Sequence, residues 1–265
     1  MTLTTTIPAL DLATQVAMLW AVPLAGARGG GLFECYPDCG ASLVLRLSSS
    51  GCRLALVGPC SRKAVLPLDA DAEYIGVRFL AGQVPRVADL RPADLNDELF
   101  ELSRLGGMRL DDLAEQLVAR PDLPSRQALI EALLRGGAPL VRDVRVRRAA
   151  LLLEKHAGQL RVDALAAAMG LHARSLERLF RNHLGVSPKR LARLARFRHL
   201  VARLTTGGGA SQADLAFACG YSDQAHMIRE FKELAGHRPG EAVAAQPLRP
   251  VRGEPADYVP PRCRG

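Results

Sequence analysis

Residues 227–239, MIREFKELAGHRP, repeat the pattern of residues 176–188, LERLFRNHLGVSP, at an offset of 51 positions. In both segments an apolar residue and a phenylalanine stand four positions apart with an arginine midway, and a glycine and a proline follow at the same distances. Self-similarity of this kind within one chain is the mark of a duplicated structural unit. We therefore expect the same unit twice in the C-terminal half.

The repeat extends upstream into a second helix. Leu165-Ala166 matches Leu215-Ala216 at an offset of 50, so the second unit has one more residue before its second helix. Each unit thus consists of a short helix, a turn that contains Gly170 or Gly220, and a second helix, which is typical of a helix-turn-helix. Glycine suits this turn because it adopts the positive φ that ends the first helix.

The apolar pairs fix which face of each second helix points outward. Leu176 with Phe180, and Met227 with Phe231, are i, i+4 pairs and should face the core. A helix fits the major groove of DNA, where Arg recognises guanine, Gln recognises adenine and Glu accepts from cytosine. We therefore predict that the residues on the opposite face contact bases: Arg174, Glu177, Arg178, Gln224, Ala225, Ile228 and Arg229.

Other basic residues should contact the phosphates, which adds affinity without sequence information. We assign this role to Arg181, Lys189, Arg190 and Lys232, and expect some further arginines of the helix from Pro188 to Leu204 to share it. Residues 141–265 carry 22 Lys and Arg against 11 Asp and Glu, whereas residues 1–140 carry 13 against 16. This asymmetry indicates that the second half meets a polyanion. Two units could enter successive major grooves, about 34 Å apart.

The N-terminal half has a different pattern. FECYP, ASLVLRL, RLALVG and EYIGVRFL indicate strands between about residues 30 and 80, and leucines at three- and four-residue steps from Asp94 onward indicate helices between about 92 and 135. The predicted fold class is α+β, with a small cupin-like β-domain and appended helices followed by an all-α domain of two helix-turn-helix units joined by a long helix. We place the domains at 1–138 and 139–245, and expect the proline-rich tail, 246–265, to be disordered.

These motifs resemble the AraC/XylS family of bacterial transcription regulators. The resemblance covers about residues 140–242 and rests on LAAAMGLHARSLERLFRNHLGVSP, RFRHLVARL and DLAFACGYSDQAHMIREFKELAGHRP. It implies two helix-turn-helix subdomains bridged by a long helix, with both recognition helices facing DNA and the base-facing positions given above. His172 stands where the family usually has a Ser or Thr cap. Before residue 140 the chain is similar to an uncharacterised cupin-like sensor domain, which implies effector binding or dimer contacts.

The sequence also bears on two other classes of function, an enzyme and a cysteine-based sensor. An enzyme on a cupin-like barrel needs histidine metal ligands, and all six histidines lie after residue 140, so we expect no enzyme, no catalytic residues, no metal site and no cofactor. A cysteine-based redox or alkylation sensor could use Cys35, Cys39, Cys52 and Cys60, since Arg53 and Arg62 could lower a thiol pKa. A regulator that responds to oxidation or alkylation of these cysteines is therefore the alternative hypothesis.

The expected partners follow from the prediction that the protein binds DNA. They are double-stranded DNA, a small-molecule effector at the N-terminal domain, RNA polymerase if the protein is an activator, and a second copy of the chain, whose presence is left open. The first twenty residues contain no Lys or Arg, as a secretory signal would need, and apolar runs fall short of the roughly 18 residues that span a bilayer. We therefore expect a cytoplasmic protein without membrane contact.

Overall fold

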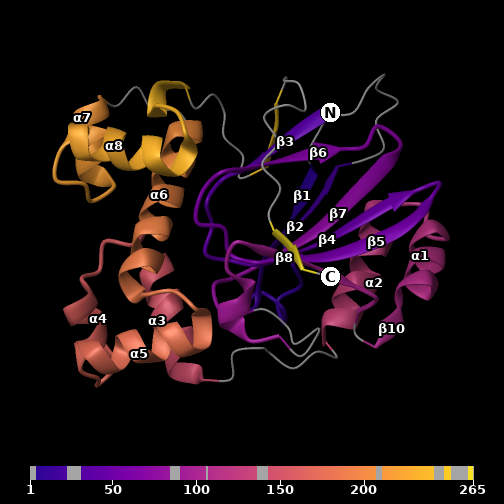
Figure 1. Cartoon of the computed structure of the whole chain (residues 1–265), viewed down its shortest axis with the longest axis horizontal. Helices are drawn as coiled ribbons and strands as arrows, with labels where there is room; N and C mark the ends of the chain where they lie inside the picture. Colours follow the sequence, from indigo (N-terminus) through magenta and orange to yellow (C-terminus); the bar gives the residue numbers. More distant parts are fainter. Residues whose placement is uncertain are drawn as a thin grey trace.

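The computed structural model describes residues 4–22, 31–83, 90–105, 107–135, 143–206, 211–241, 248–251 and 262–264. Strands dominate up to residue 109 and helices dominate after it, so the α+β fold class expected from the sequence is confirmed. Figure 1 shows the β-rich domain beside a column of helices that runs along its edge. No helix among the described residues is long and apolar enough to cross a membrane.

The N-terminal domain is built on a seven-stranded sheet in the order β1-β2-β7-β4-β5-β8-β12. A three-stranded sheet has the order β11-β3-β6, and β9 pairs with β10. The strands of this domain are β1 (Thr4–Thr6), β2 (Val16–Val22), β3 (Gly31–Cys35), β4 (Ser42–Ser48), β5 (Gly51–Val57), β6 (Ala64–Leu68), β7 (Ala72–Phe79), β8 (Glu98–Leu102), β9 (Arg104–Leu105) and β10 (Met108–Arg109). Strands β11 (Leu248–Val251) and β12 (Arg262–Arg264) come from the C-terminal tail.

Alternation along the strands divides the large sheet into two covered faces. Leu43 and Leu45 of β4 are buried on the face that packs against helices α1 (Leu110–Val118) and α2 (Leu123–Arg135). Trp20, which lies between two residues of that face, is buried in a separate cluster with Leu68 and Tyr74. Because successive side chains of a strand point to opposite sides, Trp20 belongs to the other face of the sheet.

The structure differs from the sequence prediction at residues 98–102. Leucine spacing indicated a helix there, but Pro92–Leu95 forms a 3-10 helix, η1, and Glu98–Leu102 is strand β8, paired with β5. The same segment also has Phe100 and Leu102 at the two-residue period of a strand, and pairing with β5 satisfies its backbone groups. The edge of the sheet therefore overrides the helical pattern, while α1 and α2 fall within the expected range.

The tail also differs from the prediction of a disordered segment. Leu248–Val251 forms β11 against β3, and Arg262–Arg264 forms β12 parallel to β8. Both strands extend an edge, where unpaired backbone N–H and C=O groups accept another strand. The other residues of the tail, and the expected boundary between the domains at 138–139, lie outside the described residues.

The C-terminal domain contains six helices within its described part. They are α3 (Val144–Lys155), α4 (Val162–Ala168), α5 (Ala173–Leu184), α6 (Pro188–Thr206), α7 (Gln212–Ala218) and α8 (Gln224–Ala235), followed by the 3-10 helix η2 (Pro239–Glu241). Helices α4 and α5 form the first predicted unit and α7 and α8 the second, with α6 between them. The expected duplication is therefore present in the fold.

The two turns have the same backbone geometry. Gly170 has φ +65° and Gly220 has φ +77°, as expected for glycines that end a helix. The next residue in each unit closes the helix by donating its N–H to the carbonyl of an alanine five positions earlier. Leu171 donates to Ala166 and Tyr221 donates to Ala216, both at 2.9 Å. Four residues separate α4 from α5 and five separate α7 from α8, which is the one-residue difference read from the sequence.

The start of the second helix differs between the units. Asp223 caps α8, since its carboxylate accepts a hydrogen bond from the N–H of His226 at 2.6 Å. His172 precedes α5 without any side-chain cap. The first N–H groups of α5 consequently lack the acceptor that a Ser, Thr, Asn or Asp would supply.

The hydrophobic core of the C-terminal domain extends into the N-terminal domain. Tyr36, Cys39 and Ala81 are buried in the same cluster as Phe180, Phe231 and other core residues of the helices. The Tyr36 ring packs edge-on against Phe197 of α6, with 5.9 Å between centroids. The two domains are therefore joined by apolar packing as well as by the chain itself.

An ion cluster lies beside this packing. Asp38 accepts from Arg78 of β7, with 2.5 Å to Nη2, and Arg198 Nη1 of α6 lies 3.5 Å from the same carboxylate. Glu154 of α3 is 3.3 Å from that nitrogen of Arg198. Burial raises the pKa of Asp38, but attraction to Arg78 and Arg198 outweighs it and lowers that pKa from 3.8 to about 2. Asp38 thus bridges both domains as a carboxylate.

Replacing Asp38 should weaken the contact between the domains and lower the stability of the protein. In Asp38→Ala the buried guanidinium of Arg78 loses its partner, and we expect a loss of about 3 kcal/mol in the free energy of unfolding. Urea unfolding followed by circular dichroism measures this. The matched control is Asp163→Ala, which removes an exposed carboxylate of the C-terminal domain; equal losses in both variants would contradict the bridging role.

The same carboxylate predicts a dependence on pH. Because its folded pKa lies below its ordinary value, the stabilisation by Asp38 is complete above about pH 4 and is lost as the pH falls toward 2. We expect Asp38→Asn to remove part of the acid-induced decrease in stability, measured as the urea midpoint between pH 5 and pH 2.5. An unchanged slope in the variant would exclude this contribution.

A cap added to α5 should stabilise the first unit. In His172→Ser the hydroxyl can accept from the N–H groups of the first turn, and we expect a gain of about 0.5–1 kcal/mol in the free energy of unfolding. The control is His156→Ser, which alters an exposed histidine directly after the C-terminal end of α3. If His172→Ser is no more stable than that control, solvent already satisfies the first N–H groups of α5.

Candidate nucleic-acid interface

The predicted base-facing residues lie on the outer sides of α5 and α8. Arg174, Glu177 and Arg178 of α5 are exposed, whereas Leu176 and Phe180 are buried. The rotation of this helix therefore agrees with the one inferred from the i, i+4 pair.

Helix α8 repeats this arrangement with one difference. Gln224, Ala225 and Arg229 are exposed, and Met227 and Phe231 are fully buried. Ile228 is half-buried and packs against the core, so only part of its side chain is available to a ligand. Its predicted contact with a base remains a prediction.

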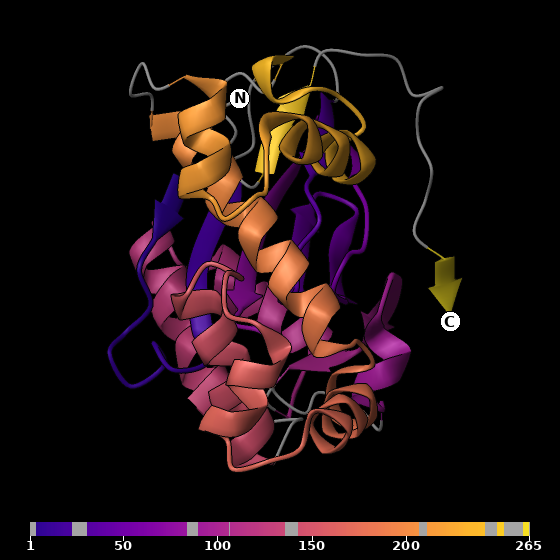
Figure 2. The same ribbon diagram turned by 90° about the vertical axis from the view of Figure 1, so that its left-hand side faces the viewer.

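The two helices are held at opposite ends of α6. Figure 1 shows α5 near one end of α6 and α8 near the other, and Figure 2, turned by 90°, shows the same separation along α6. Helix α6 contributes Leu191, Leu194 and Phe197 to the core shared by the two units. The long helix is thus the spacer that sets the separation of α5 from α8.

The residues expected at phosphates are also exposed. Arg181, Lys189 and Lys232 have exposed side chains and form no ion pair within the described residues. Arg190 is different, because its Nη2 lies 3.4 Å from the carboxylate of Asp97 in the N-terminal domain. An exposed pair of this kind contributes little to stability and can exchange partners.

The inner arginines of α6 have structural partners, which the sequence did not indicate. Arg193 contacts Glu230 at 3.0 Å and Glu233 at 2.6 Å, and Arg196 lies over the ring of Tyr221 at 5.1 Å. Arg198 belongs to the Asp38 cluster. These charges connect α6 to its neighbours, so the surplus of positive charge that is open to a polyanion is smaller than the sequence count.

One predicted base reader already has a protein partner. The side-chain amide of Gln224 donates to the side-chain oxygen of Gln212 on α7 at 3.0 Å. Such a bond orients the amide of Gln224 before any ligand arrives, at the N-terminal end of α8. Gln212 was not singled out from the sequence, since nothing in its local pattern marks it.

The N-terminal domain contacts the C-terminal end of each recognition helix. Asn96 donates its amide N–H to the carbonyl of Leu184 at the end of α5, at 3.1 Å. The N–H of Lys63 donates to the carbonyl of Leu234 near the end of α8, also at 3.1 Å. Tyr36 and His237 share a further hydrogen bond of 2.9 Å just after α8. The exposed N-terminal halves of both helices are left open.

Three of the cysteines singled out from the sequence have raised thiol pKa values. Burial raises the pKa of Cys39 and of Cys60 to about 12, and that of Cys52 to about 11. The proposed lowering by Arg53 and Arg62 is therefore wrong, because desolvation disfavours the thiolate. The described part of the chain contains no group of three or more His, Cys, Asp or Glu side chains that could hold a metal ion.

The family comparison matches this part of the chain. A family profile described as "Helix-turn-helix domain" matches residues 165–245. A stretch of 77 residues is 38% identical to the HTH-type transcriptional regulator GlxA of Rhizobium meliloti (strain 1021). This stretch is 29% of the present chain and 24% of GlxA, so the chain spans about a quarter of the length of that relative.

The chain is also similar to solved structures. The C-terminal domain of AraT, a response regulator from Geobacillus stearothermophilus, is 24% identical with a TM-score of 0.36, over 38% of this chain and 84% of that one. ToxT from Vibrio cholerae is 10% identical with a TM-score of 0.46, over 91% and 97%. The duplicated motif and the matched profile identify residues 165–245 as a helix-turn-helix domain.

Proposed function

We propose that the protein is a sequence-specific DNA-binding transcription regulator whose two recognition helices, α5 and α8, enter successive major grooves of one duplex. The observation that carries this proposal is the matched exposure of Arg178 and Arg229 at the same position of two duplicated helices. Each can donate two hydrogen bonds to the O6 and N7 atoms of guanine. A single exposed arginine would carry little weight, but its repetition in both units indicates a common role.

The roles of the remaining side chains follow from their places. Arg174, Glu177, Gln224 and Ala225 are exposed on the same helices and are proposed to read neighbouring base pairs, with Ile228 at the edge of the contact. Lys189, Arg181 and Lys232 are proposed to contact phosphates, and Arg190 to do so after it leaves Asp97. Phosphate contacts of this kind fix the register of the protein on DNA.

The N-terminal domain is proposed to regulate this binding. Its contacts with the ends of α5 and α8 and with the middle of α6 involve both units at once, so a change in how it docks alters the relative position of the two recognition helices. A ligand that favours one docked arrangement thereby changes DNA affinity. RNA polymerase, if the protein activates transcription, and a second copy of the chain complete the proposed partners, in a cytoplasmic setting without catalytic activity.

Removal of either recognition arginine should weaken specific binding. With a site selected from a random duplex pool by the intact chain, we expect Arg178→Ala and Arg229→Ala each to cost about 1–3 kcal/mol of binding free energy and to relax the preference for one guanine. Fluorescence anisotropy with the selected and a scrambled duplex measures both effects.

Arg53→Ala is the control for these variants, because it removes an exposed arginine from the N-terminal domain. It should bind the selected duplex like the unaltered chain. The proposal fails if the scrambled duplex competes equally with the selected one at about 0.15 M salt, or if the arginine variants lose no more affinity than the control.

Two basic residues of α6 should behave differently. Lys189→Ala should weaken binding to all duplexes alike and reduce the slope of log affinity against log salt by about 1. Arg193→Ala should leave that slope unchanged and instead lower the thermal midpoint of the C-terminal domain, because its partners are Glu230 and Glu233. A lower slope in Arg193→Ala would place that side chain at the DNA.

A further inference from the structure

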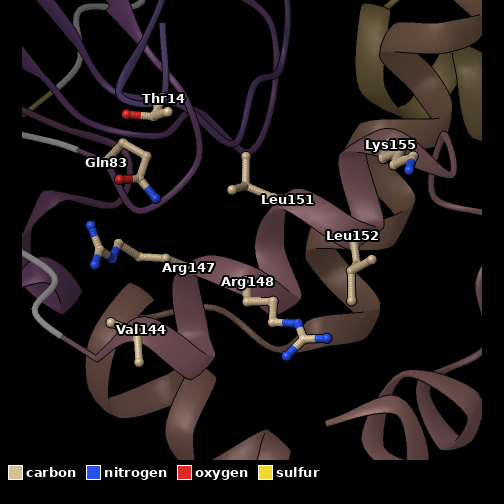
Figure 3. Close-up of a pocket in the computed structure, with 8 residues that line it drawn as sticks. All are labelled: Thr14, Gln83, Val144, Arg147, Arg148, Leu151, Leu152 and Lys155. Atoms are coloured by element: carbon tan, nitrogen blue, oxygen red, sulfur yellow. The ribbon is translucent and has the colours of Figure 1, made fainter. Parts of the chain in front are cut away.

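A cleft of about 340 Å³ opens where helix α3 meets the N-terminal domain (Figure 3). One wall is formed by Thr14 and Gln83 of the N-terminal domain, and the other by side chains along the outer side of α3. The opposite side of α3, which includes Val146 and Leu153, is buried in the core of the C-terminal domain. The cleft therefore lies at the junction of the two domains, remote in sequence from α5 and α8.

The charges of the cleft are all positive. Arg147, Arg148 and Lys155 line it, and no carboxylate does. Within the described residues none of the three has an ion-pair partner. The two acidic side chains adjoining these residues are already engaged, since Asp143 pairs with Arg145 at 2.7 Å and Glu154 with Arg198 at 3.3 Å.

One of these cations contains a buried donor that lacks an acceptor. Nε of Arg147 is buried and makes no hydrogen bond. An unsatisfied buried N–H is unfavourable by about 1–3 kcal/mol, so such groups are uncommon unless a ligand or ion completes them. In Figure 3 the side chain of Arg147 extends toward Gln83, where the two walls of the cleft meet.

The remainder of the cleft is apolar. Leu151 is 38% exposed and Val144 is 63% exposed, and both line it. Exposed large apolar side chains beside polar groups are the composition of small-molecule sites, where apolar contacts supply affinity and a few polar groups fix orientation. The volume is at the lower end of the range found for such sites, about 300–1,000 Å³.

The geometry points to a binding site for a small organic anion, in which a carboxylate or sulfonate is held by Arg147 and its neighbouring cations while an apolar body covers Leu151 and Val144. A simple inorganic anion would leave the apolar wall in water, and a neutral apolar molecule would leave the three cations without a counter-charge. Only a molecule with both parts matches both the cations and the apolar side chains that α3 presents to the cleft.

The position of the site links it to regulation, and this step rests on the proposed function. A ligand here contacts Thr14 and Gln83 on one domain and α3 on the other, so it binds only when the domains are docked. The ligand and DNA must then change each other's affinity by the same factor. The effector would thus act at the domain junction, whereas the sequence indicated a site on the N-terminal domain alone.

The test uses 2-naphthoate and its uncharged analogue 2-naphthamide with the full chain, in isothermal titration calorimetry. We expect saturable binding of one naphthoate per chain, with the amide at least tenfold weaker. Arg147→Gln should weaken naphthoate about tenfold and leave the amide unchanged, whereas Leu151→Asn should weaken both. Arg161→Gln is the matched control, because it removes an exposed arginine of the same domain outside the cleft.

The outcomes separate the site from the proposed function, because calorimetry does not involve DNA. Equal binding of acid and amide, equal loss in Arg161→Gln, or no saturable binding below about 1 mM would overturn the site. Thermal midpoints of the variants establish that each is folded. If naphthoate binds as expected but leaves the affinity for the selected duplex unchanged, the link to regulation is overturned and the site remains.

Discussion

Burial of one phenylalanine in each helix-turn-helix unit is the constraint on which the proposed interface depends. Phe180 and Phe231 are fully buried, and each is preceded by a buried residue one helical turn earlier. Once these positions face the core, the 3.6-residue period leaves only one side of each helix for solvent. The arginine midway between the two buried residues must then lie on that side. The chemistry of the interface follows from packing rather than from the charged residues themselves.

The contacts between the domains place this interface under the influence of the N-terminal half. Asp38 connects β7 to α6 through Arg78 and Arg198, and hydrogen bonds from Asn96 and Lys63 reach the ends of α5 and α8. Because these contacts are at the C-terminal ends of the recognition helices or along the spacer, they leave the proposed base-facing residues uncovered, whereas Arg190, proposed at a phosphate, pairs with Asp97 of the N-terminal domain. A domain that holds both units in this manner can change their spacing without occupying the site.

Sequence reasoning succeeded where a local pattern sufficed. The repeat predicted the two helix-turn-helix units, the turns at Gly170 and Gly220, and the exposed faces of both recognition helices, because each depends on residues within a few turns of one another. It failed at Glu98–Leu102, where the edge of β5 decided the structure, and at the arginines of α6, whose partners lie on other helices. Asp38 had no local signal at all, since its partners are 40 and 160 positions away. Long-range pairing of charges cannot be read from spacing.

The most direct test of the double-groove account is protection of guanine N7 from dimethyl sulfate on the selected duplex. The account predicts two clusters of protected guanines about one helical turn apart on one face of the DNA. The cluster contacted by α5 should be lost in Arg178→Ala alone, and the cluster contacted by α8 in Arg229→Ala alone. A single cluster, or two clusters that both persist in each variant, would contradict the account.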